Sequence, residues 1–168
     1  MEKLVGIKQI VCGSVFLGAL AVVVIAQSAF ATPITGVQST SPAVGTFDEG
    51  LEANSKTDTL EVKLRATGPT DVQMLQNTIA PGGTMGWMSH PGPSIVVVQS
   101  GELTMYGAAD PTCAPQVYKP GAGFVMPTGE VHVVRNEGSV DAVVYVTSII
   151  PKGANRRIDE PDPGTCGF

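Results

Sequence analysis

The sequence lacks several features, and each absence removes a class of function. It has no basic stripe: 10 Lys and Arg stand against 15 Asp and Glu, for a formal net charge of −5. Nucleic acid is therefore not an expected partner. Nucleotide-binding loops are also missing, because Gly121-Ala122-Gly123 lacks a third glycine and a following helix. Histidine is scarce, with only His90 and His132, and nothing supports a serine-type triad built on either of them.

Long apolar patterns of helical period are absent from the main part of the chain, whereas glycine and proline are abundant. Short apolar segments separated by turn residues predict an all-β sandwich or closed barrel. Four consecutive branched residues, Ile95 to Val98, predict a strand buried on both faces. Ser100-Gly101 predicts a hairpin into the next strand. The expected strands cover 60–65, 71–80, 84–90, 94–99, 102–106, 114–119, 124–126, 130–135 and 140–150.

The N-terminus is typical of a secretory signal peptide over residues 1–31. Lys3 and Lys8 precede an apolar run, and Ala29-Phe30-Ala31 supplies a cleavage motif. The alternative is an uncleaved membrane anchor, although the run is slightly short for a span. With cleavage, we expect a secreted, periplasmic or cell-envelope protein with no other membrane-spanning segment.

Two cysteines remain after such cleavage, Cys113 and Cys166. In an oxidising compartment an even pair favours a disulfide, and two free thiols are the alternative. A disulfide would tether the Pro-rich tail, 151–168, to the barrel. In that tail Arg156-Arg157 is most simply interpreted as a solvated pair.

The remaining organisation is expected to be an arm followed by one domain. Residues 32–56 are rich in Thr, Ser, Pro and Gly without a sustained period, which indicates a flexible N-terminal arm. Such an arm could add an edge strand to a partner. The barrel itself is expected over 57–150.

One histidine lies in a pattern of fixed spacing that resembles the second motif of the cupin superfamily, a jelly-roll barrel family. Every anchor of that motif is present: Gly121, Pro127, Gly129, His132 and Asn136. Glycines at two anchors allow backbone conformations that other residues avoid. Alternation along the strand points His132 into the barrel.

The first cupin motif is present in part. Gly82 and Gly101 bound it, and His90 occupies the second position of its His-x-His pair. Met88 stands at the first histidine position, and Ser94 stands at the glutamate position. Residues 87–94 and the two cysteines are also similar to those of small exported bacterial cupin proteins of poorly defined role.

The resemblance implies a metal site of three histidines and a carboxylate, of which this chain keeps only His90 and His132. Met88 would be a third ligand only for a soft metal, and a catalytic metal needs about three protein ligands. The methionines are alternatively gap-filling core residues. We expect a ligand-binding barrel, with one transition metal at His90 and His132 as a further candidate. The alternatives are a metal-dependent oxygenase or isomerase and a structural role in the envelope; a homodimer is compatible with each.

Overall fold

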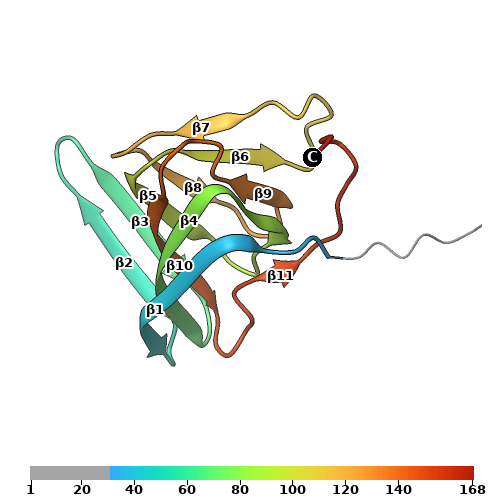
Figure 1. Cartoon of the computed structure of the whole chain (residues 1–168). Coiled ribbons are helices and arrows are strands. Elements are labelled where there is room, and N and C mark those ends of the chain that lie inside the picture. Colours follow the sequence, from blue (N-terminus) through green and yellow to red (C-terminus); the bar gives the residue numbers. More distant parts are fainter. Residues whose placement is uncertain (1–30) are drawn as a thin grey trace, which may run out of the picture.

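The computed structural model describes residues 31–168, and the chain forms strands without a helix over this range (Figure 1). No helix in the described range is therefore long and apolar enough to cross a membrane. Residues 1–30 of the expected signal peptide lie outside the described residues. The strands are β1 (Thr35–Phe47), β2 (Leu51–Lys56), β3 (Glu61–Ala66), β4 (Thr70–Ser89), β5 (Ser94–Ser100), β6 (Leu103–Gly107), β7 (Gln116–Tyr118), β8 (Gly123–Met126), β9 (His132–Arg135), β10 (Ala142–Pro151) and β11 (Ile158–Asp159).

The main sheet curls into a nearly closed barrel because one long strand, β4, belongs to both of its halves. The first half of β4 pairs with β10 on one edge and β1 on the other. Its second half pairs with β9 and, at its end, with β11. The resulting strand order is β7-β6-β9-β4-β10-β5-β8. The expected all-β barrel is therefore confirmed.

The bend in β4 replaces the turn that the sequence predicts between two separate strands at Pro81-Gly82-Gly83. Gly82 has a φ of 74° and Gly86 a φ of 68°, both in the left-handed region that glycine tolerates. Asn136 fixes the bend from the opposite side. Its backbone exchanges hydrogen bonds with Gly82 and Gly83, and its side chain donates to the carbonyls of Ile79 and Val140. The strand therefore continues through its glycines.

Strand β5 is buried on one face only, which corrects the expectation from its four branched residues. Val96 and Val98 lie in the core, whereas Ile95 is 47% exposed and Val97 46% exposed. Side chains alternate between the faces of a strand, and within residues 31–168 no second layer covers the outer face. The apolar run therefore packs one face into the barrel wall and leaves the other face as an exposed apolar surface.

The predicted hairpin after β5 does not form. Gly101 turns the chain with a φ of 71°, but β5 then pairs with β10 and β8, whereas β6 pairs with β7 and β9. A Cβ at Gly101 would lie 2.5 Å from the carbonyl oxygen of Asp141. Gly101 therefore allows the chain to pass close to Asp141 as it crosses from β5 to β6.

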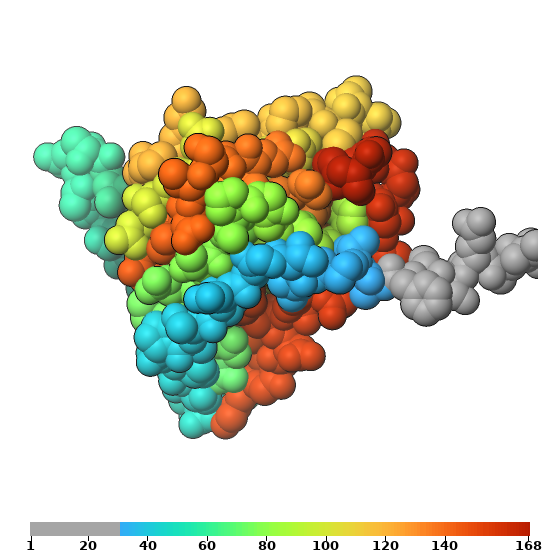
Figure 2. All heavy atoms as spheres, viewed as in Figure 1, coloured from blue at the N-terminus to red at the C-terminus, as the bar shows by residue number. Residues whose placement is uncertain are grey.

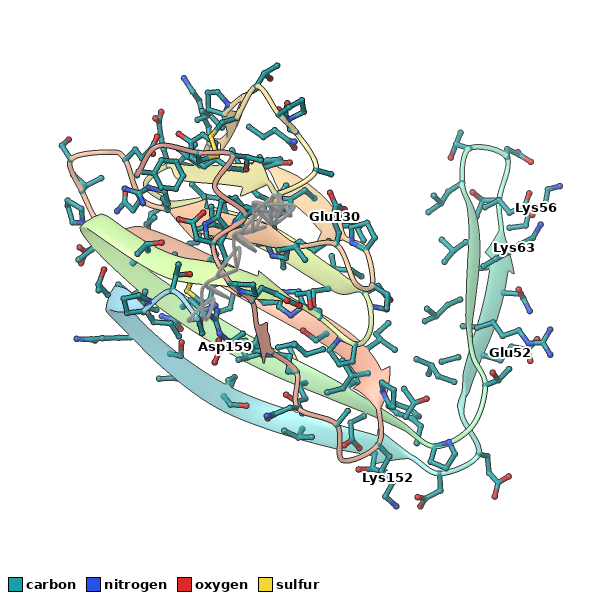
Figure 3. All side chains as sticks on the ribbon, turned by 90° about the vertical axis from the view of Figure 1, so that its right-hand side faces the viewer. Glu52, Lys56, Lys63, Glu130, Lys152 and Asp159 are labelled. Carbon is teal, nitrogen blue, oxygen red and sulfur yellow. A yellow bond between two sulfur atoms is a disulfide. The ribbon has the colours of Figure 1, made fainter. Side chains whose placement is uncertain are left out.

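Much of the expected flexible arm is ordered as strand. β1 pairs with β4 along the front of the barrel in Figures 1 and 2, and β2 pairs with β3. Side chains of β1 are almost all exposed, so backbone hydrogen bonds and not an apolar pattern hold it in place. The composition of β1 therefore lacks the apolar alternation from which a strand is predicted. Figure 3 shows the β2–β3 hairpin standing apart from the barrel, with Lys56 and Lys63 pointing away from it.

The C-terminal tail folds back onto the barrel. β11 pairs with the end of β4, and the Ser89 hydroxyl donates to Glu160 at 2.6 Å. Cys113 and Cys166 form a disulfide with their Cα atoms 5.4 Å apart, and Figure 2 shows the last residues against the loop after β6. Below this disulfide lies a small core on the outer side of β4, β6 and β9, made by Trp87, Tyr106, Val133 and Cys166.

We expect loss of this disulfide to destabilise the folded chain. The cysteines are 53 residues apart, and a loop of that length corresponds to about 4 kcal/mol of unfolding free energy in the chain-entropy model. Urea unfolding of the wild type with and without reductant measures the difference. The double variant Cys113→Ser/Cys166→Ser is the control, because reductant should not change its midpoint. Two titratable thiols in unreduced, denatured wild-type protein would contradict the disulfide.

Candidate functional site

The two histidines meet inside the barrel, although 42 positions separate their numbers in the chain. His90 directly follows β4, and His132 begins β9, the strand that pairs with the end of β4. Their ring centroids are 5.2 Å apart, and they are 1% and 2% exposed. The amide of Gly129 donates to the His90 carbonyl, so the turn before β9 also holds the two segments together. The fold therefore brings both predicted residues into one place.

Each ring has the same hydrogen-bonding arrangement. Nδ1 of His90 lies 2.8 Å from the carbonyl oxygen of Arg156, and Nδ1 of His132 lies 2.8 Å from that of Glu130. A carbonyl oxygen only accepts, so Nδ1 carries the proton and donates in both rings. Both Nε2 atoms are buried without a partner. When the rings are neutral, each Nε2 therefore presents a lone pair.

Burial keeps the rings neutral at physiological pH. Desolvation lowers the pKa of His90 from 6.5 to about 4, although its hydrogen bond to the Arg156 carbonyl acts in the opposite direction. Desolvation also lowers the pKa of His132, opposed by the Glu130 carbonyl. The positive charge of Arg157 lowers both pKa values further. A buried imidazolium beside a guanidinium is unfavourable, so the site holds neutral acceptors.

Met88 lies beside the histidines but is already in contact with another group. It is opposite His132 in the β4–β9 register, and its side chain belongs to the barrel core. Nη1 of Arg157 donates to the Met88 sulfur at 2.7 Å. The remaining motif position is also satisfied, because the hydroxyls of Ser94 and Ser148 are 2.7 Å apart and both residues are buried.

These residues do not fit a catalytic transition metal. Two imidazole Nε2 atoms suit such an ion, but the Met88 sulfur contacts a cation and Ser94 is neutral and hydrogen-bonded. Over residues 31–168 no group of three or more His, Cys, Asp or Glu side chains could hold a metal. The guanidinium of Arg157 also repels a second cation nearby.

The arginine pair in the tail is part of this site, which corrects its interpretation as a solvated pair. The Arg157 side chain is only 13% exposed. Its Nε pairs with the exposed Asp159, while Nη2 is buried without a partner. Arg156 lines the barrel cavity next to His90. Sequence spacing alone does not reveal this, but the cysteine at 166 was a signal that the tail returns to the barrel.

A small and mostly apolar cavity lies beside His90, Met88 and Arg156. Its volume is about 30 Å³, which is room for two or three water-sized groups. Its lining residues are Asn77, Ile79, Met85, Met88, His90, Val96, Leu103, Phe124, Met126, Val134, Val144, Val146 and Arg156. Most of the methionines therefore pack in the core or against this cavity, whereas Met74 faces outward. Trp87 lies on the other side of the wall, beneath the tail.

Comparison with solved structures found several similar chains. Oxalate oxidase in complex with the substrate analogue glycolate is 30% identical, over 46% of this chain and 41% of its own, with a TM-score of 0.41. A cupin superfamily protein from Desulfitobacterium hafniense is 14% identical, over 66% of this chain and 81% of its own, with a TM-score of 0.42. The DMSP lyase DddQ from Ruegeria pomeroyi is 16% identical, over 55% of this chain and 45% of its own, with a TM-score of 0.47.

This chain spans less than half the length of the oxalate oxidase. No curated protein sequence matches it. The family model for the cupin domain matches residues 76–148, which run from the first half of β4 into β10 and include both histidines. With that match and the nearly closed barrel, residues 76–148 are identified as a cupin domain.

Proposed function

We propose that this chain is an exported cupin that binds a small organic molecule inside its barrel through His90 and His132. One observation carries the proposal: both Nε2 atoms are buried without a hydrogen-bond partner, and the two rings lie side by side with their centroids 5.2 Å apart. Buried polar atoms in proteins are nearly always satisfied, and an exception needs an explanation. A bound molecule that donates hydrogen bonds supplies one.

The proposed site has the usual composition of a ligand pocket. It combines an apolar wall with a few polar groups that would orient a bound molecule. The alternative, a metal-dependent oxygenase or isomerase, needs a third strong metal ligand that Met88 and Ser94 do not provide. Binding without robust catalysis is therefore the function that we favour.

Ligand binding should be visible directly at the two histidines. They are the only histidines in the chain, so a tag-free protein labelled with ¹⁵N-histidine gives an unambiguous spectrum. We expect small hydroxylated molecules to shift an Nε2 resonance, because a new hydrogen bond changes its environment. His132→Phe, which keeps an aromatic ring but removes the acceptor, should weaken binding at least tenfold. A panel of small polar molecules that shifts neither ring would refute the proposal.

Metal binding at the histidines is the alternative to this proposal, and one feature is compatible with it. Metal-bound histidines commonly donate their other ring N–H to a carbonyl, as both rings do here. We expect the wild type, dialysed against Mn, Ni, Cu or Zn, to retain well below one metal per chain by elemental analysis. The variant Met88→His/Ser94→Glu/Arg157→Gln, which restores the ligands and removes the cation, should approach one.

Two results would contradict that account of the metal site. Wild-type stoichiometry near one would show that Met88 and the histidines suffice. A triple variant that folds but binds no metal would show that positions 88 and 94 are not correctly placed for ligands. Adding both His90→Phe and His132→Phe to the triple variant is the control, because it leaves only two ligands and should abolish binding.

Export and dimerisation complete the proposal. Export rests on the leader pattern and on the Cys113–Cys166 disulfide, and the mass of the exported chain, expected to begin at Thr32, checks it. The dimer rests on the outer face of β5, β8 and β10. There Ile95 lies opposite the exposed Val125, and Val97 lies opposite the exposed Tyr145. An uncharged apolar patch of this kind suits an identical patch on a second copy.

We expect Val97→Lys to shift the chain from dimer to monomer in light scattering, because a buried lysine would be placed at the centre of the interface. Val140→Lys is the matched control, since Val140 is exposed in the turn before β10, away from this face. A monomeric wild type at micromolar concentration would rule out the dimer.

A further inference from the structure

We propose that residues 154–163 of the tail form a strap that closes the barrel over its two histidines and swings away to admit other molecules. His90 is 1% exposed and His132 is 2% exposed, so no molecule reaches either ring unless part of the chain moves. Figure 3 shows this segment running from Lys152, just after β10, to Asp159 in β11. The inference goes beyond the proposed binding function, because it concerns how the histidines are reached and not what occupies the site.

The strap lies directly on the residues that carry the site. The carbonyl oxygen of Arg156 accepts a hydrogen bond from Nδ1 of His90 at 2.8 Å. Nη1 of the next residue, Arg157, donates to the Met88 sulfur at 2.7 Å. Both contacts fall at the end of β4, where the chain turns away from the sheet. Displacing the strap therefore uncovers His90 and Met88 without separating any of the longer strands.

Both ends of the strap are anchored, and each anchor adjoins a glycine. At the start, the amide of Gly153 donates to the Asp71 carboxylate at 2.9 Å. At the far end, the disulfide joins Cys166 to Cys113. Gly153 and Gly164 have φ values of 74° and 71°, and a Cβ at either would meet no atom within 4 Å. Backbone conformation and not crowding favours glycine here, so the strap has a hinge at each end.

The middle of the strap is held by few contacts that resist opening. None of residues 151–165 is buried, and Ile158 is 44% exposed although it pairs with β4. Opening therefore exposes little apolar surface. The hydroxyl of Ser89 donates to Glu160 at 2.6 Å, a contact that water can replace. Nη2 of Arg157 is buried without a partner, and opening allows water to reach it. Segments of this kind open locally while the rest of the fold stays intact.

Chemical modification of the histidines measures this opening without any ligand. Diethyl pyrocarbonate transfers an ethoxycarbonyl group to a neutral imidazole nitrogen, and peptide mass spectrometry resolves His90 from His132. If closing is faster than modification, the rate reports the population of the open strap. We expect a slow rate in the wild type with a shallow urea dependence, because a local opening exposes little surface. Rates are divided by that of free N-acetylhistidine in the same urea.

Two variants loosen the strap, and a third serves as the matched control. Cys113→Ser/Cys166→Ser frees one end and should raise the modification rate at least tenfold. Ser89→Ala removes the bond to Glu160 but keeps the disulfide, so a smaller increase of several-fold is expected. Leu75→Ala destabilises the whole chain from a buried position in the first half of β4. Without urea, its rate should equal that of the wild type.

Three results would overturn the strap. A wild-type urea dependence as steep as that of global unfolding would show that the histidines are reached only when the chain unfolds. An increase in Leu75→Ala as large as in the double variant would show the same. Unchanged rates in both strap variants would place the entrance elsewhere, such as the turn at 127–131. The wild-type urea series needs no variant, so it decides the matter even where the double variant does not fold.

The outcome is also separable from that of the proposed function. A chain that binds no small molecule in the ¹⁵N-histidine experiment can still show local opening of the strap, because the reagent alone is the probe. A chain whose entrance lies elsewhere can still bind a molecule at the histidines. The two experiments therefore fail independently.

Discussion

The backbone of β4 has hydrogen-bonded neighbours on both edges along most of its length, and this pairing constrains the whole barrel. Its first half is held between β1 and β10, and its second half between β11 and β9. A strand paired in this way cannot shift its register without moving its side chains to the wrong face. The bend at Gly82 and Gly86 is therefore fixed, and so is the direction in which Met88 and His90 emerge from it.

The same pairing connects the tail to the site. β11 occupies the free edge at the end of β4, where Asp159 lies opposite Met88 and Ile158 opposite Ser89. Arg157 directly precedes Ile158, and this pairing brings its guanidinium within hydrogen-bonding distance of the Met88 sulfur. The Arg156 carbonyl is likewise brought to Nδ1 of His90, from which it accepts a hydrogen bond. The disulfide and the Trp87 cluster hold the end of the tail down. A segment outside the barrel motifs thus places a positive charge beside Met88 and fixes the tautomer of His90.

The sequence predicted the residues whose role is local, and it failed where a role depends on distant pairing. The spacing from Gly121 to Asn136 located His132, because the turn glycines and the strand residues of that motif adjoin one another in the chain. Asn136 fixes its own turn by accepting from the Gly138 amide, but its bonds to Ile79, Gly82 and Gly83 were not predicted. The β1 strand was missed because its exposed side chains have no apolar period. The crossing at Gly101 resembled a hairpin, since the turn chemistry is the same for both. Arg157 could not be assigned, because only the fold shows that residue 157 returns to residue 88.

The pattern of satisfied and unsatisfied polar atoms also separates structural from functional residues. Ser94 and Ser148 are fully buried and bond each other, so the position of the missing glutamate has become part of the core. Within residues 31–168, four buried side-chain atoms lack a partner, and three of them belong to His90, His132 and Arg157. The fourth, Nε of Arg135, lies 3.3 Å from a Glu137 oxygen. Because an unpaired buried polar atom destabilises the fold by about 1–3 kcal/mol, three at one site are unfavourable unless a bound molecule pairs with them. These unpaired atoms therefore support the proposed ligand site, whereas Met88 and Ser94 do not supply the two metal ligands that the motifs would require.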